Sequence, residues 1–387
     1  MKKLGIYVHI PFCQRKCKYC GFVSFDNCSH RDWRIYFDAL IKEVEMRAHE
    51  YEDYEIDTIF IGGGTPTIVP AEWIEEVLKI IKNKFNNCIK QEITIEANPG
   101  TLTPEKLEIY RFSGINRLSI GVQSLDDRVL KAIGRIHDRN TFLETFKDAR
   151  EAGFENINID LMFSLPLQTD EIWINTINEA VALRPDHISF YSLQIEEGTE
   201  FYEMYKKGEL DIADDETDRK RYHTAAELLK AAGYHHYEIS NAAIPGRESV
   251  HNTKYWKMDE YLGFGIAAHS FTKGRRFYNT SEFDEYVSSI EKGNLASLED
   301  EVCTKDDLIF EYVFTGLRMT EGISLDDFKD RFGVPFSDYY KDKTDYLKKQ
   351  VGEGYITTDD ENFKTGRLAL TLKGIDVSNS IMSEFAK

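Results

Sequence analysis

Three closely spaced cysteines are the residues best suited to chemistry. Cys13, Cys17 and Cys20 follow a short apolar run in a C-x3-C-x2-C spacing, and they make up half of the chain's six cysteines. A loop that leaves the end of a strand can bring three thiolates around one inorganic centre. Three protein ligands leave one coordination position open, which in metal sites is typical of chemistry rather than of structure.

The residues alone leave two kinds of site open. One is a structural zinc site, in which His9 or Cys28 completes the set of ligands. The other is an iron–sulfur cluster, which is also held by thiolates. The spacing does not decide between them.

The residues around the cysteines add a resemblance. Tyr-Val-His-Ile-Pro-Phe-Cys at positions 7–13, with aromatic Tyr19 before the last cysteine, resembles the radical S-adenosylmethionine (SAM) superfamily. Within it, the motif is similar to the branch of oxygen-independent coproporphyrinogen III oxidase (HemN) and the haem chaperone HemW. The resemblance implies that the three cysteines bind three irons of a [4Fe-4S] cluster and that SAM binds the fourth.

The resemblance also implies a set of SAM contacts at the ends of successive strands. These residues are Tyr7, Tyr19, Gly63, Gly64, Thr65, Glu96, Gln123, Arg135 and Asp160. Glycines let a backbone approach a ligand, and mixed charges suit a ligand with sulfonium, ammonium and carboxylate groups. On residues alone, the glycine run could be a tight turn, Glu96 an exposed carboxylate, and the two tyrosines core aromatics. His9 is expected to order the loop.

Two features separate the branches of this family. Oxidases of the HemN type resemble C-x3-C-x2-C-x-C, and Phe22 stands where their fourth cysteine would be. Only six residues precede Tyr7, fewer than the longer N-terminal segment expected of those oxidases. Both features favour the chaperone.

A second motif lies in the later part of the chain. His251-Asn252-Thr253-Lys254-Tyr255-Trp256 fits the HNxxYW pattern that is associated with haem binding in HemW. A single histidine beside aromatics is more often structural. The resemblance nevertheless implies haem contacts from His251, Tyr255 and Trp256, because imidazole is a common haem ligand and aromatic rings can flank a porphyrin. His269 is the rival ligand or a neighbour of SAM.

The hydrophobic pattern predicts alternating strands and helices. Strands are expected at 4–9, 58–61, 92–96, 117–120, 156–161 and 187–191, with helices at about 31–49, 73–85, 103–112, 126–133, 140–152 and 170–183. This alternation predicts βαβ units with a parallel sheet and chemistry at the carboxyl ends of the strands. An open doubly wound sheet fits the pattern equally. The resemblance favours an α/β fold with a partial (β/α)6 TIM-like barrel.

Three regions are expected along the chain. Residues 1–235 form the barrel, 236–300 a connecting segment with the HNxxYW motif and no clean βα unit, and 301–387 a HemN-type C-terminal domain. In the last region, helices at about 305–319, 324–332 and 337–350 and short strands near 355–356 and 368–370 predict a winged-helix-like unit.

Bulk properties exclude several classes of function. A net charge of −19 argues against nucleic-acid binding, which depends on Lys and Arg. No apolar run is long enough to cross a bilayer, and the N-terminus lacks the apolar core of a signal peptide. The scattered Cys28, Cys88 and Cys303 predict no disulfide framework. We expect a cytoplasmic protein, with peripheral membrane contact left open.

The expected function is that of a haem chaperone. It would bind the cluster, SAM and haem, and pass haem to an acceptor protein that the sequence does not identify. The alternative is an oxygen-independent coproporphyrinogen III oxidase or a related tetrapyrrole enzyme, in which cleaved SAM yields a radical that attacks the propionate side chains.

Overall fold

A twelve-stranded sheet with a parallel centre organises the structure, a computed structural model that describes residues 1–386. The last residue of the expected C-terminal region lies outside the described residues. Six consecutive strands pair in parallel in chain order. They are β1 Lys2–Ile10, β2 Tyr54–Gly63, β3 Asn86–Ala97, β4 Arg117–Gln123, β5 Ile157–Phe163 and β6 His187–Ser192. β3 is longer than expected.

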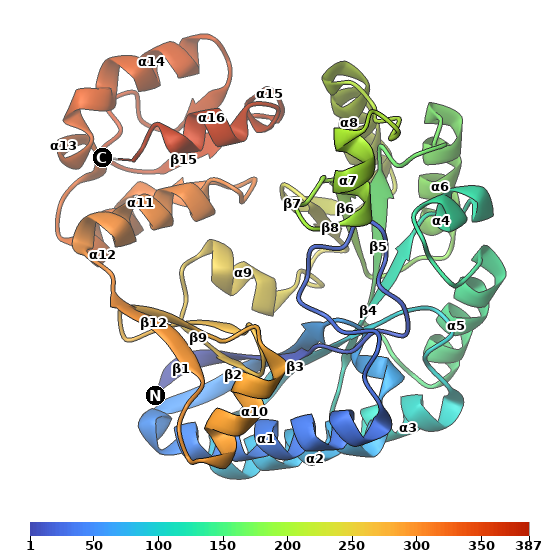
Figure 1. Cartoon of the computed structure of the whole chain (residues 1–387). Coiled ribbons are helices and arrows are strands. Elements are labelled where there is room, and N and C mark those ends of the chain that lie inside the picture. The colour runs from blue at the N-terminus through green and yellow to red at the C-terminus, as the bar shows by residue number, and fades with distance from the viewer. Residues whose placement is uncertain (387) are drawn as a thin grey trace.

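Helices connect these strands, which confirms the expected α/β class and the barrel of βα units (Figure 1). They are α1 His30–Ala48, α2 Ala71–Lys84, α3 Pro104–Phe112, α4 Asp127–Ala132, α5 Arg139–Glu151 and α6 Asp170–Ala182, and two more helices, α7 Glu200–Lys206 and α8 Asp215–Ala231, follow β6. The start of α3 follows from its sequence. The Thr103 hydroxyl accepts from the backbone N–H of Lys106, and Pro104 takes the first turn, where no N–H is needed.

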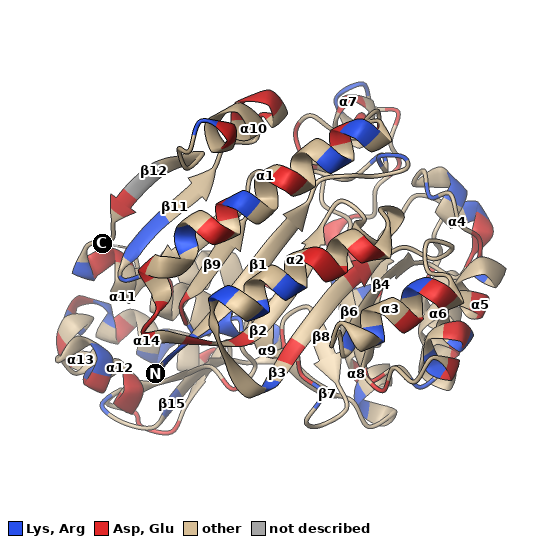
Figure 2. Ribbon diagram, turned by 90° about the horizontal axis from the view of Figure 1, so that it is seen from below, with Lys and Arg blue, Asp and Glu red and all other residues tan. Residues whose placement is uncertain are grey.

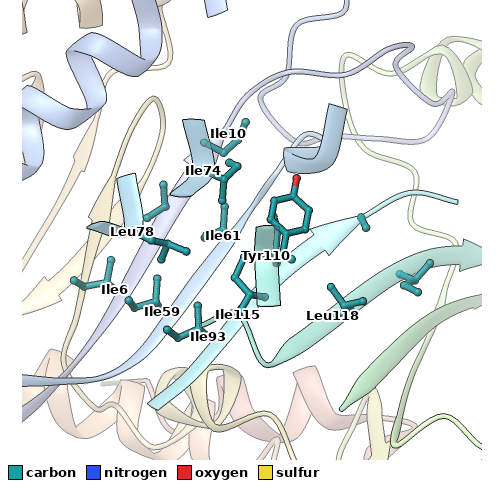
Figure 3. Packing of buried hydrophobic residues seen from close by; sticks show 14 of the residues in the cluster. Ile6, Ile10, Ile59, Ile61, Ile74, Leu78, Ile93, Tyr110, Ile115 and Leu118 are labelled. Carbon is teal, nitrogen blue, oxygen red and sulfur yellow. The ribbon is translucent and has the colours of Figure 1, made fainter. Parts of the chain in front are cut away.

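The two faces of the sheet differ in chemistry. Side chains alternate along a strand, and the outward set is apolar: Ile59 and Ile61 of β2 pack against Ile74 and Leu78 of α2 (Figure 3). The inward set is largely polar and buried, and includes Thr94, Ser119, Asn158 and His187. A barrel interior of this kind is suited to polar ligands at its open end.

The segment 236–300 extends the sheet at both of its ends. β7 His235–Glu238 and β8 Asn241–Ala243 lie beyond β6. β9 Tyr261–Phe264 pairs in parallel with β1, and β10 His269–Thr272, β11 Arg275–Asn279 and β12 Ser297–Val302 follow outward. Two helices, α9 Val250–Trp256 and α10 Phe283–Glu291, belong to the same segment. The boundary at residue 235 stays a prediction, but the sheet runs continuously across it.

A buried carboxylate ties this extension to the first helix. Glu43 of α1 is fully buried. It accepts hydrogen bonds from the backbone N–H of Gly265 at 2.9 Å, from Nδ2 of Asn279 at 2.7 Å and from the hydroxyl of Tyr286 at 2.7 Å. These bonds satisfy the charge that burial would otherwise leave unsolvated.

The C-terminal region forms a second unit with its own core. Its elements are α11 Lys305–Gly316, β13 Ile323–Ser324, α12 Leu325–Phe332, α13 Phe336–Tyr339, α14 Thr344–Gly352, β14 Ile356–Thr358, β15 Arg367–Leu370, α15 Leu372–Ile375 and α16 Ser378–Ser383. The helix expected at 337–350 is broken. Tyr340 leaves the helical conformation (φ −102°, ψ 35°), and its buried ring packs between Phe336 and Phe385.

The outer helical face carries both signs of charge. Lys and Arg are interspersed with Asp and Glu along α1, whereas on α2 the glutamates lie in the first half and the lysines in the second (Figure 2). Within residues 1–386, no helix has the length and apolar character needed to span a membrane.

Candidate functional site

The cysteine loop follows β1 at the carboxyl end of the parallel strands. The backbone N–H of Cys13 donates to the carbonyl of Phe25 at 2.9 Å. Further along, the N–H of Lys18 donates to the carbonyl of Ile133 at 3.2 Å, and its carbonyl accepts from Phe201 at 2.9 Å. The loop is therefore fastened on two sides, and its three cysteines stay partly exposed.

The surroundings of the thiols suit ligands of a positive centre. Burial raises the pKa of the Cys13 and Cys20 thiols, so their thiolate forms need a compensating charge. Arg135 Nη1 donates to Cys17 Sγ at 3.5 Å, and Thr65 Oγ1 lies 3.8 Å from Cys13 Sγ. Among residues 1–386, no three His, Cys, Asp or Glu side chains form a group that could hold a single metal ion.

His9 is occupied by its neighbours. Its Nδ1 lies 3.0 Å from the Tyr7 hydroxyl, and its Nε2 lies 2.9 Å from the carbonyl of Val23. Burial lowers its pKa to about 4, so the ring is neutral. His9 therefore orders the loop, and neither of its nitrogens is available to complete a zinc site.

The glycine run brings the backbone of β2 close to Glu96. Gly63 has a φ of +114°, and a Cβ there would lie 2.6 Å from Cε1 of His9, so only glycine fits. The N–H of Gly63 donates to Glu96 Oε2 at 3.0 Å. Desolvation and the nearby charge of Asp160 raise the pKa of Glu96 to about 8.

Further polar side chains lie on the neighbouring strands. Asp160 and Glu96 are both partly exposed, and burial raises the pKa of Asp160. Gln123 has a φ of +68°, and its Oε1 accepts from the hydroxyl of Tyr191 at 3.2 Å. Arg135 Nη2 donates to Asn98 Oδ1 at 2.6 Å.

Asn98 and Tyr191 join the site without having been proposed from the sequence. Asn98 links two expected residues, because it accepts from Arg135 and donates to Thr65 Oγ1 at 2.8 Å. The signal was their position: Asn98 follows β3 directly, and Tyr191 lies near the end of β6.

Two observations on these polar residues are consistent with a bound SAM: one buried nitrogen without a hydrogen-bond partner, and the mixture of charges. Arg135 Nε is buried and has no hydrogen-bond partner among the described residues. Such atoms are rare unless a ligand or water completes them. Asp160 lies close enough to Glu96 and Arg135 to interact with both electrostatically, and one guanidinium with two carboxylates matches a ligand that carries carboxylate, ammonium and sulfonium groups.

The two tyrosines beside the loop lie in different places. Tyr19 packs against the small core of Val129, Ile133 and Phe201, and burial raises its pKa. Tyr7 points into the barrel, where its ring stacks on Phe60 with the centroids 6.2 Å apart.

The expected haem residues do not share one surface. His251 is fully buried inside the barrel. Its Nδ1 lies 2.8 Å from Thr58 Oγ1, and its Nε2 lies 2.8 Å from the Tyr255 hydroxyl. Burial lowers its pKa to about 3. Both ring nitrogens are hydrogen bonded and protein surrounds the ring, so iron would reach it only after these contacts change.

Trp256 faces the C-terminal unit. Its ring packs in a small core with Tyr237 and Met319, and the Arg318 guanidinium lies 4.4 Å from its centroid. The Trp256 ring therefore forms a contact between the two units, while its buried Nε1 has no hydrogen-bond partner among the described residues.

A cleft of about 360 Å³ lies beside the cysteine loop and brings the remaining candidates together. Tyr7, Tyr255, Tyr261 and His269 line it, and exposed Phe22 stands at its rim with 67% of its surface accessible. His269 is exposed, its ring stacks on Tyr278 at 5.0 Å, and desolvation and the charge of Arg276 lower its pKa. A neutral, accessible imidazole is the form that binds iron.

Two known protein families match different parts of the chain. Residues 7–180 match the radical SAM superfamily, and residues 303–377 match the HemN C-terminal domain.

Known proteins resemble the chain over most of its length. The haem chaperone HemW of Bacillus subtilis is 39% identical over 84% of this chain and 86% of its own. HemW of Lactococcus lactis is 32% identical over 99% of this chain and 97% of its own length. The structure of Escherichia coli coproporphyrinogen III oxidase, HemN, superposes with a TM-score of 0.87 at 25% identity, over 100% of this chain and 90% of that one.

Proposed function

Because this chain belongs to the HemN/HemW branch of the radical SAM superfamily, we propose that it is a haem chaperone of the HemW type. In this proposal it binds a [4Fe-4S] cluster, SAM and haem, and it passes haem to an acceptor protein. The observation that carries the proposal is the cleft beside the cysteine loop, where an accessible imidazole meets aromatic walls. The names of the HemW relatives support the same function.

Cys13, Cys17 and Cys20 would hold the cluster, with Arg135 close to the Cys17 sulfur. Gly63, Gly64 and Thr65 would lie along SAM, and Glu96, Gln123, Asp160, Asn98 and Tyr191 would surround it. The cluster and SAM would supply one-electron chemistry when bound. In this chain Arg135 and the two carboxylates would orient the charged end of the ligand, and Tyr7 would separate it from the cleft.

His269 is the proposed haem ligand. Its ring is exposed and is kept neutral by partial desolvation. The side chains of Tyr7, Tyr255, Tyr261 and Phe22 would form an aromatic wall, which suits the face of a porphyrin. His251 acts behind this wall by holding the hydroxyl of Tyr255.

An oxidase remains the second candidate, because the superposition on HemN extends over the whole chain. Phe22 counts against it. It occupies the position of the fourth cysteine of HemN-type oxidases, and it exposes an apolar ring at the rim of the cleft.

The deciding experiment uses the anaerobically reconstituted full chain, reduced with dithionite. We expect haem to bind stoichiometrically in an absorption titration and to move to an added apo-haemoprotein, with no protoporphyrinogen formed from coproporphyrinogen III and SAM. Product formation with stoichiometric SAM cleavage would establish the oxidase instead.

The cluster assignment is tested separately. We expect Cys17→Ala to lose the brown cluster absorbance and most of its iron and sulfide. Cys88→Ala, which changes a cysteine on β3 outside the loop, should retain both. Full iron content in the Cys17 variant would exclude this site.

A further inference from the structure

An arginine on the sheet beside the cleft binds a carboxylate of the C-terminal unit through one edge of its guanidinium. Arg276 of β11 binds Glu311 of α11 side-on: Nε donates to its two oxygens at 2.9 and 3.1 Å, and Nη2 donates as well. Nη1 donates to the Tyr261 hydroxyl at 3.4 Å. The pair is partly exposed, with 37% of the Arg276 side chain and 26% of the Glu311 side chain accessible.

Arg276 belongs to the same surface as the proposed haem ligand. In the register of β10 and β11, His269 lies opposite Tyr278, and Phe271 lies opposite Arg276. Side chains two residues apart on a strand share a face, so Arg276 and Tyr278 point to the side on which His269 lies. Tyr261, which lines the cleft, accepts from Arg276.

Haem carries two propionate carboxylates, which differ little in chemistry from the side chain of Glu311. One guanidinium edge binds one carboxylate in the bidentate mode. Glu311 holds the edge formed by Nε and Nη2 of Arg276, so a propionate that binds this edge must replace Glu311.

Resting on the proposed function, we propose that Arg276 binds a haem propionate in exchange for Glu311, so that Glu311 gates the polar end of the haem cleft. Loading haem then frees the contact between β11 and α11, and Glu311 competes for Arg276 when haem leaves. Tyr261 keeps the guanidinium in place during the exchange.

The exchange predicts opposite changes in haem affinity when Arg276 and Glu311 are replaced. If the pair only stabilised the fold, removing either partner would weaken haem binding or leave it unchanged. If Glu311 is a competitor, Glu311→Gln should tighten haem binding by about tenfold, while Arg276→Gln should weaken it by about tenfold. The Gln side chain at 311 keeps the shape but cannot match the charged bidentate contact.

The test compares haem with haem dimethyl ester, which has no propionate charge, on the full chain by absorption titration. The wild type should prefer the free acid by about tenfold, and Arg276→Gln should bind both equally. Arg139→Gln is the control. It breaks the Arg139–Glu179 pair on the outer helices, whose exposure is similar at 41% and 32%, and it should keep the wild-type preference.

The outcomes separate this proposal from the function on which it rests. A wild type that binds neither compound would reject the haem function. A wild type that binds both, with the same acid-to-ester ratio in Arg276→Gln or with weaker binding in Glu311→Gln, would reject the exchange at Arg276 alone.

Discussion

Both ring nitrogens of His251 form hydrogen bonds within the protein. We therefore propose His269, rather than His251, as the ligand of the haem iron. The HNxxYW motif directs attention to His251, but its bonds to Thr58 and Tyr255 lie inside the barrel. His269, eighteen positions later, has an accessible ring on the cleft. Motif and ligand can therefore differ: the motif would shape the wall from behind, and another residue would provide the imidazole.

We expect His269→Ala to lower haem affinity at least tenfold and to remove the spectroscopic signature of an axial imidazole, because no nitrogen replaces it. In His251→Ala, that signature should persist. Affinity should fall less, since the hydroxyls of Thr58 and Tyr255 lose a partner but the proposed iron ligand is kept. Absorption and electron paramagnetic resonance spectra of both haem-loaded variants provide the check. An imidazole signature lost in the His251 variant alone would reverse the assignment.

Glu96 should make the unliganded protein sensitive to pH. Its pKa rises from 4.5 to about 8 on folding, because desolvation and Asp160 disfavour the charge. The folded state then holds a proton that the unfolded state has released, so the stability from this group is complete below about pH 4.5 and is lost as pH rises through about 8. Denaturant titrations without SAM should show Glu96→Gln gaining stability over wild type across this range. A constant difference would contradict the raised pKa.

At the scale of elements, the local pattern predicted the βα units but not the extension of the sheet. Each βα unit has its own alternation of apolar residues, so 4–9 or 117–120 can be recognised from neighbouring residues alone. β9 is different, because four residues pair with β1 some 250 positions away and the sequence carries no local sign of a partner. Glu43 is a similar case. Its helix was expected from the local pattern, but its buried carboxylate accepts hydrogen bonds from Gly265, Asn279 and Tyr286, which lie far away in the chain.

Glu43→Ala should therefore destabilise the attachment of α1 to the extension. Its removal leaves three buried donors without an acceptor, so we expect a loss of about 3–5 kcal/mol in the free energy of unfolding. Glu45→Ala, two residues along the same helix, removes an exposed pair with Lys84 at 3.2 Å and should cost less than about 1 kcal/mol. Equal effects in chemical denaturation would show that the Glu43 bonds add nothing.

At the scale of the whole molecule, the two units share side chains at their boundary. Phe271 of β10 and Met258 belong to the core of the C-terminal unit. The backbone N–H of Thr320 donates to the carbonyl of Tyr237 at 3.0 Å, and that of Ile239 donates to the carbonyl of Arg318 at 3.0 Å. Composition and periodicity separated the units near residue 301, but they could not predict contacts formed by residues so far apart in the chain.

Trp256 tests this boundary, because the motif assigns it to haem and the structure assigns it to Arg318 and Met319. We expect Trp256→Ala to lower the Tm by about 5 °C, since a large ring and its cation–π contact are lost. Haem affinity should stay within about twofold of wild type, because Trp256 does not line the cleft.

Arg318→Ala is the matched variant: it removes the cation and should also lower the Tm, by a smaller amount. Calorimetry and haem titration on both variants decide the matter. A tenfold loss of haem affinity with an unchanged Tm would return Trp256 to the haem site and would require the cleft to extend toward the C-terminal unit.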